Sequence, residues 1–98
     1  MFGLEIEDIE VIKKVLHKFP EIEKAFVFGS RALGNYKKGS DIDIALMAKD
    51  DIEESVTRIS FELNEETVLP YYFDIVEYRT IENIELKRHI DEKGIQIL

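Results

Sequence analysis

The sequence predicts an α/β (α+β) fold, in which helices pack on a single small β-sheet. Segments with apolar residues three and four positions apart, which are typical of helices, alternate along the chain with short apolar runs that are typical of strands. The expected order is helix, strand, strand, helix, strand, helix. The chain has 98 residues, enough for one hydrophobic core but not for two, so residues 1–98 are interpreted as one domain.

Three long helices are expected. The first covers residues 6–19, where apolar side chains recur on one face and acidic residues precede basic ones, as the helix dipole favours. Pro20 is expected to end it, because proline cannot continue a helix. Asp50 or Asp51 is the expected N-cap of the second helix, which extends through about Glu65. The third covers residues 81–93, and Thr80 is its expected N-cap.

Strands are expected where short runs are apolar, β-branched or aromatic. These runs are residues 25–28, 41–47 and 71–78. A final apolar segment, residues 95–98, is interpreted as an edge strand or as a contact for a partner. Between the first two strands, residues 34–40 combine glycines with polar residues and predict a loop, after at most one helical turn that begins at Ser30.

Composition excludes several classes of protein. The chain has 13 basic and 21 acidic residues, a net charge of -8, which disfavours general binding to nucleic acid. It has no cysteine, which excludes disulfides and thiolate chemistry and agrees with a cytoplasmic location. No apolar run approaches the ~18 residues that a membrane span needs. We expect a cytoplasmic protein without a membrane segment, and homo-oligomer formation is left open.

Three features predict a common site. Gly29 and Ser30 end the first expected strand, Asp41 and Asp43 begin the second, and Asp74 lies inside the third. Asp41 and Asp43 share one face, because strand side chains alternate. If the second and third strands lie beside the first, the three carboxylates meet, and their repulsion raises their pKa values. Asp74 lies between two apolar residues and is expected to lose solvation without a cation nearby.

A divalent metal ion would relieve this repulsion. Oxygen ligands without cysteine fit Mg²⁺ or Mn²⁺ better than Zn²⁺, and Mg²⁺ held by carboxylates commonly completes its coordination with water and phosphates. The Gly29-Ser30 turn offers amides and a hydroxyl to such phosphates, and Arg31, Lys37 and Lys38 are nearby cations. Taken singly, Gly29 is typical of a turn, and the pair Asp41 and Asp43 is typical of a solvent-facing strand edge. Together they predict a site for a metal-bound nucleoside triphosphate.

Residues 28–44 read FGSRALGNYKKGSDIDI. Gly-Ser, ten intervening residues and Asp-x-Asp resemble the signature of the polymerase-β-like nucleotidyltransferase superfamily, and the wider string is similar to the minimal nucleotidyltransferase (MNT) proteins. The likeness extends over essentially the whole chain. It implies the polymerase-β-like nucleotidyltransferase fold, a small mixed sheet with helices packed on it. It also implies an enzyme that transfers AMP from ATP to a hydroxyl with two Mg²⁺ ions.

The resemblance assigns a role to each residue of the site. The residues that it matches to nucleotide binding are Gly29, Ser30 and Arg31, and those that it matches to metal binding and catalysis are Asp41, Asp43 and Asp74. In the superfamily, the acid at the position of Asp74 also helps to activate the acceptor hydroxyl. The chain departs from the pattern at Leu33, where many relatives have a second arginine, so one phosphate or partner contact is expected to be missing.

The resemblance also implies a partner. Minimal members of the family are commonly antitoxins of HEPN-domain ribonuclease toxins, and some transfer AMP to a tyrosine of the toxin. A HEPN toxin is therefore the expected partner and acceptor. Two alternatives stay open: a catalytically silent antitoxin that neutralises a toxin by binding only, and nucleotidyl transfer to a small molecule. The presence of all three acids favours catalysis, and 98 residues leave no room for the helical acceptor domain of longer relatives.

Three residues outside this set receive other interpretations. His17 and His89 fall in expected helices, far from the acids in sequence, and are assigned surface or packing roles. Tyr36, in the loop before the acid pair, is a candidate for stacking on a nucleotide base.

Overall fold

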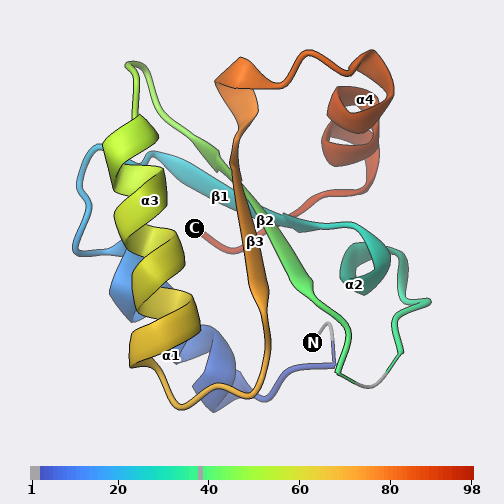
Figure 1. Ribbon diagram of the computed structural model, residues 1–98. Coiled ribbons are helices and arrows are strands. Elements are labelled where there is room, and N and C mark those ends of the chain that lie inside the picture. Colours follow the sequence, from blue (N-terminus) through green and yellow to red (C-terminus); the bar gives the residue numbers. More distant parts are fainter. Residues whose placement is uncertain (1–2, 38) are drawn as a thin grey trace.

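The computed structural model describes residues 3–37 and 39–98, and over these residues it contains a four-stranded sheet with helices on both faces (Figure 1). The elements in chain order are α1 (Ile6–Leu16), β1 (Lys24–Phe28), α2 (Ser30–Leu33), β2 (Ile42–Met47), α3 (Glu53–Phe61), a π-helical segment (Glu62–Glu66), β3 (Phe73–Glu77), a 3₁₀ turn (Tyr78–Thr80), α4 (Ile84–Lys93) and β4 (Ile95–Gln96). The predicted α/β fold with a single mixed sheet is confirmed.

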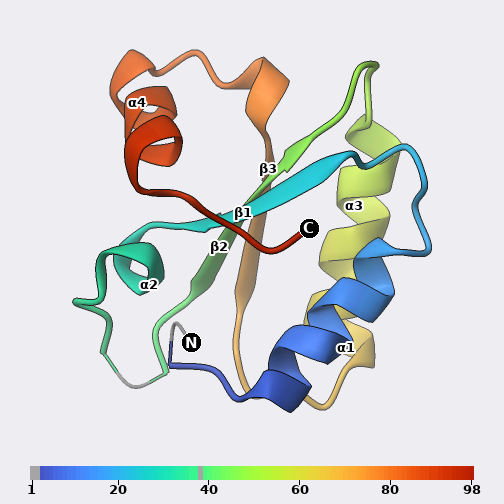
Figure 2. The same cartoon turned by 180° about the vertical axis from the view of Figure 1, so that it is seen from behind.

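The strands lie in the order β3-β2-β1-β4. β1 is antiparallel to both β2 and β4, whereas β2 and β3 are parallel. β3 therefore lies beside β2, and the expectation that the second and third strands both lie beside the first was wrong. The physical reason is the connection: α3 carries the chain back along the sheet, which lets β3 join β2 in parallel. β4 confirms the expected edge strand, and Figure 2 shows it lying along β1.

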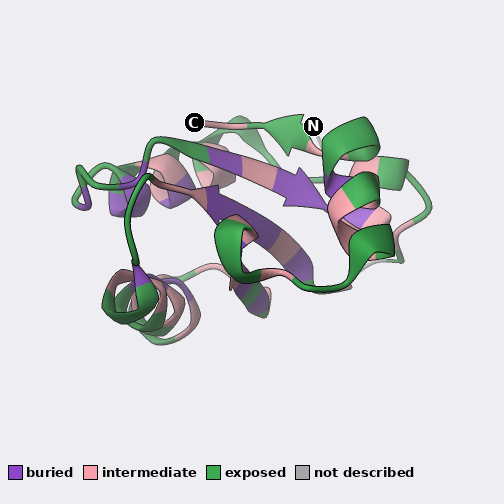
Figure 3. Ribbon diagram, turned by 90° about the horizontal axis from the view of Figure 1, so that it is seen from above, coloured by how far each residue is buried: buried purple, intermediate pink, exposed green. Residues whose placement is uncertain are grey.

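Helices cover the two faces of the sheet unequally. α1 and α3 lie on one face, where they bury a large apolar core, and α4 lies on the other over a smaller cluster that contains Phe28, Ala45 and Ile90. Figure 3 shows that buried residues concentrate along the strands, while the outer turns of the helices are exposed. The largest fully buried side chains are Ile12, Leu16, Val27, Ile42, Ile44, Leu46, Ile59, Leu63 and Phe73. Within the described residues, we find no helix with the length and apolarity of a membrane span.

All three predicted helices have boundaries that differ from the sequence prediction. α3 begins at Glu53 and ends at Phe61, and the segment that continues it, Glu62–Glu66, is π-helical. α1 ends at Leu16 instead of Phe19, because Pro20 disfavours helical geometry at the residue before it and the chain closes in turns over 17–19. Thr80 is not the N-cap of α4. Its hydroxyl donates to the Glu77 carbonyl within the 3₁₀ turn, and Asn83 caps the helix by accepting the Leu86 amide at 3.1 Å.

Candidate active site

The acids meet on the face of the sheet that carries α4. Asp43 pairs in register with Phe28 on one side and with Asp74 on the other. Strand alternation turns Asp43 to the same face as Ala45, which packs beneath α4. Asp41 lies one residue before β2 and is exposed. The structure thus places Asp43 and Asp74 next to each other, with Asp41 at the start of the same strand.

The charges of these acids interact. Burial raises the pKa of Asp43, the negative charges of Asp74 and then Asp41 raise this pKa further, and His89 lowers it. Asp74 differs from its sequence expectation. It is exposed, on β3, which is an edge strand of the sheet. The acid that loses solvation is therefore Asp43, at the centre of the sheet.

The donor set suits a hard divalent cation. Among residues 3–37 and 39–98, no three His, Cys, Asp or Glu side chains are arranged so that they could hold a metal ion by themselves. Mg²⁺, however, is commonly bound by one or two carboxylates and completes its coordination with water and substrate phosphates. Asp43 and Asp74 supply two adjacent carboxylates whose mutual repulsion a cation would relieve. The residues present therefore fit Mg²⁺ bound together with a phosphate ligand.

Gly29 connects the end of β1 to α2 through a backbone conformation with φ 72° and ψ -153°. This region is essentially restricted to glycine. A Cβ atom at Gly29 would collide with the Asp43 carboxylate, so the glycine also gives that acid its space. The sequence predicts a turn that faces a phosphate here, and in the structure the group that lies against Gly29 is the Asp43 carboxylate. Ser30 begins α2 directly after this turn.

His89 belongs to the site although its position in the sequence did not suggest it. Its Nε2 accepts a hydrogen bond from the Gly29 amide at 2.8 Å, across 60 residues of sequence. Its ring lies edge-on to Phe28, with the ring centroids 6.2 Å apart. The available signal was helical spacing: His89 follows Leu86 by three positions and precedes the buried Ile90, so it lies on the side of α4 that faces the sheet. His17, in contrast, is exposed at the C-cap of α1.

Arg31 fastens the loop after α2. Only 3% of its surface is exposed, and its guanidinium lies 4.7 Å from the ring centre of Tyr36 and 5.2 Å from that of Tyr71. Its Nη2 donates to the Ser40 carbonyl at 2.9 Å. Arg31 therefore packs inside the protein in this conformation, and its contact with a nucleotide stays a prediction. Tyr36 stacks on Arg31, so base stacking by Tyr36 stays a prediction as well.

Asn64 fixes the strand that carries Asp74. Its Nδ2 donates to the Phe73 carbonyl at 3.0 Å, and its Oδ1 accepts the Phe73 amide at 2.7 Å. These two bonds occupy the outer edge of β3, where a further strand would otherwise pair. Asn64 lies in the π-helical segment, and sequence reasoning did not single it out.

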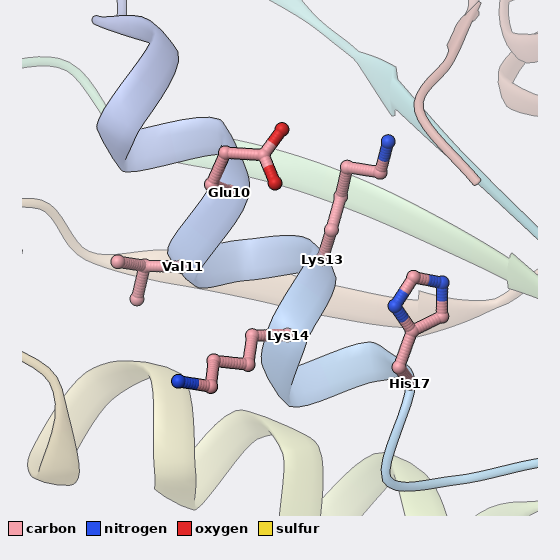
Figure 4. A pocket seen from close by; sticks show the side chains of 5 residues that line it. All are labelled: Glu10, Val11, Lys13, Lys14 and His17. Carbon is pink, nitrogen blue, oxygen red and sulfur yellow. The ribbon is translucent and has the colours of Figure 1, made fainter.

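A pocket lies elsewhere, on the surface of α1. It measures about 460 Å³ and is lined by Glu10, Val11, Lys13, Lys14 and His17, which Figure 4 shows projecting from one helix and its end. No second element contributes a lining residue, and α1 packs on the face opposite the acids. Of the cations expected near the phosphates, Lys37 is exposed and Lys38 lies outside the described residues.

Comparison with known proteins identifies the family. Residues 10–98 match the family model described as "Polymerase beta, Nucleotidyltransferase". The "Probable protein adenylyltransferase MntA" of Haemophilus influenzae is 27% identical over 74 residues, which are 76% of this chain and 65% of that protein. The chain thus spans just under two thirds of the length of this curated relative.

Solved structures agree on the fold. A toxin–antitoxin crystal structure with AMP-PNP superposes with a TM-score of 0.74 at 24% identity, covering 95% of this chain and 73% of the other. A complex of the tri-AMPylated Shewanella oneidensis HEPN toxin with an MNT antitoxin superposes with a TM-score of 0.70 at 23% sequence identity. The match covers 94% of this chain and 70% of the other. With the family match over residues 10–98, these findings lead to one conclusion: the chain belongs to the polymerase beta nucleotidyltransferase family.

Proposed function

We propose that this protein is a metal-dependent nucleotidyltransferase that transfers AMP from ATP to a hydroxyl group, and that it acts as an antitoxin by modifying a tyrosine of a HEPN toxin. The observation that carries the proposal is the in-register pair of Asp43 and Asp74, with Asp43 lying against Gly29, in a chain of this family. A cytoplasmic location remains a prediction of the cysteine-free sequence.

The three acids share the proposed binding of the metal. Asp41, Asp43 and Asp74 would hold Mg²⁺ or Mn²⁺, which when bound supplies positive charge to the phosphates and lowers the pKa of the acceptor hydroxyl. Asp43 is the best placed of the three to hold a cation. It is half-buried beside other acids, which disfavours its ionised form, and a cation would stabilise that form. Gly29 would let the backbone approach the triphosphate closely, and the amides that follow it and the Ser30 hydroxyl would donate to the phosphates, because the Gly29 amide itself is bound by His89.

The proposed chemistry is a single displacement at phosphorus. The acceptor oxygen forms a bond to the α-phosphorus of ATP, the bond from that phosphorus to the bridging oxygen breaks, and pyrophosphate leaves. The hydroxyl proton passes to the Asp74 carboxylate, acting as general base. Asp74 suits this part because it is exposed on an edge strand, where a hydroxyl carried by another protein can reach it.

The proposed acceptor rests on the relatives. One is named a probable protein adenylyltransferase, and one similar structure is described as a tri-AMPylated HEPN toxin bound to an MNT antitoxin. The acidic net charge of -8 supports a protein acceptor over RNA, which would be repelled.

The test is label transfer from ATP that carries isotope in its α-phosphate, with Mg²⁺, in a lysate of the native host. We expect a labelled protein band with the wild type and with Asp50→Asn, a control that removes an exposed acid outside the site. Asp43→Asn should abolish this label. A band that persists with Asp43→Asn would contradict the assignment. No label in any fraction would favour an antitoxin that acts by binding alone, and label only in small molecules would change the acceptor.

A further inference from the structure

The Gly29 amide is held by a residue from the far end of the chain. His89, on α4, accepts its hydrogen at 2.8 Å in a partly buried position. Nε2 accepts through its lone pair, so it is this nitrogen of the ring that faces Gly29. The bond joins α4 to the strand exit where the phosphate-binding turn begins.

The His89 ring is itself fixed in place. It lies edge-on to Phe28, at an interplanar angle of 69°. Its helical neighbour Ile90 is buried in the cluster with Phe28 and Ala45, and Leu86 packs against the same cluster. A side chain held by packing on a well-anchored helix presents its acceptor in one direction.

The Gly29 backbone needs such a constraint. Glycine has access to more backbone conformations than any other residue, so its orientation in a turn is set by what surrounds it. Gly29 lies against the Asp43 carboxylate, and its amide is bound by His89. The His89 bond therefore fixes both the start of the turn and the space that Asp43 occupies.

From these contacts we infer that His89 is a positioning residue, which preorganises the Gly29-Ser30 turn for the triphosphate of the nucleotide. This inference rests on the proposed function, because it assigns nucleotide binding to that turn. His89 acts through Gly29 and takes no part in bond making. It affects the binding of ATP by holding the Gly29-Ser30 turn in one orientation before ATP binds.

The experiment compares two substitutions that differ in one respect. His89→Gln keeps a hydrogen-bond acceptor at the position of Nε2, whereas His89→Leu keeps apolar bulk against Phe28 and removes the acceptor. Arg88→Ala, an exposed neighbour on α4, is the control. We expect His89→Leu to raise KM for ATP about tenfold, with a smaller change in kcat, because one preorganising hydrogen bond is lost. His89→Gln should restore KM to within about threefold of the wild type, and Arg88→Ala should leave it unchanged.

Other outcomes separate this inference from the proposed function. Unchanged KM in a folded His89→Leu, with activity still lost in Asp43→Asn, would overturn the inference and leave the function standing. Equal increases of KM in both His89 variants would show that the ring matters and not its acceptor, which also overturns it. If the wild type transfers nothing, the affinity for a fluorescent ATP analogue decides: a selective loss in His89→Leu supports the inference, and equal affinities or no binding by the wild type overturn it.

Discussion

At the scale of single residues, Asp43 carries a charge in an unfavourable place. Its burial and the charges of Asp74 and Asp41 raise its pKa above that of an ordinary aspartate. When folding raises the pKa of an acid, the protonated form is favoured in the folded state, so the contribution of that acid to stability falls as the pH rises through the unfolded and then the folded pKa. At neutral pH the ionised Asp43 therefore lowers the free energy of unfolding.

Asp43→Asn should stabilise the protein while it abolishes nucleotidyl transfer. We expect a gain of up to about 1 kcal/mol at pH 7, kept small because solvent screens a half-exposed carboxylate, and so a rise in melting temperature of up to roughly 4–8 °C. The gain should shrink as the pH falls through the pKa of Asp43. Thermal melts of both proteins across this range measure it. A variant less stable than the wild type at pH 7 would contradict the electrostatic explanation.

Two glycines differ in what a side chain would cost: Gly29 has a conformation essentially restricted to glycine, whereas Gly34 is in the left-handed region, which other residues adopt at a smaller cost. Gly29 and Gly34 both have positive φ, 72° and 81°, but only at Gly29 would a Cβ collide with Asp43, whereas nothing lies within 4 Å at Gly34. Gly34→Ala should cost about 1 kcal/mol and keep activity. Gly29→Ala should cost more and displace Asp43, with loss of transfer. Denaturant unfolding and transfer assays on the pair measure both effects, and equal behaviour would refute the proposed crowding of Asp43.

At the scale of elements, the side chain of Asn64 provides hydrogen-bond partners for the outer edge of β3. Asn64 makes two hydrogen bonds to the Phe73 backbone, directly before Asp74. Removing them leaves a partly buried amide and carbonyl without these partners, so Asn64→Ala should lower the free energy of unfolding by about 1–3 kcal/mol. Asn35→Ala, in the exposed loop, is the control. Urea denaturation checks this, and equal stability of the two variants would show that β3 does not need this support.

The individual elements could be predicted from the sequence better than the contacts between them. The strand that contains Ile42 and Ile44, the glycine after Phe28 and the edge strand at the C-terminus could all be predicted, because alternation and glycine breaks are local signals. The pairing of β3 with β2 could not, since strand order depends on how α3 crosses the sheet. His89 and Asn64 were missed because they bind backbone groups of other elements, and helical spacing predicts only the face of α4 on which His89 lies, not its partner.

At the scale of the whole molecule, metal binding should be visible as stability. A ligand that binds only the folded state raises the free energy of unfolding according to its concentration relative to its Kd, by about 2.7 kcal/mol at a hundred times the Kd. Mg²⁺ with ATP should therefore raise the melting temperature of the wild type. The rise should be much smaller for Asp43→Asn, while NaCl at the same ionic strength controls for screening of the net charge of -8. Equal rises in both proteins would argue against a metal held by Asp43.

The most direct measurement of the central claim compares ATP labelled at the α-phosphate with ATP labelled at the γ-phosphate, under the same conditions with Mg²⁺ and the native host lysate. Transfer of AMP predicts that the α-label becomes bound to a protein acceptor and the γ-label leaves with pyrophosphate. Both results should require Asp43. Retention of the γ-label on the acceptor, or α-label transfer that survives Asp43→Asn, would contradict the proposed nucleotidyl transfer.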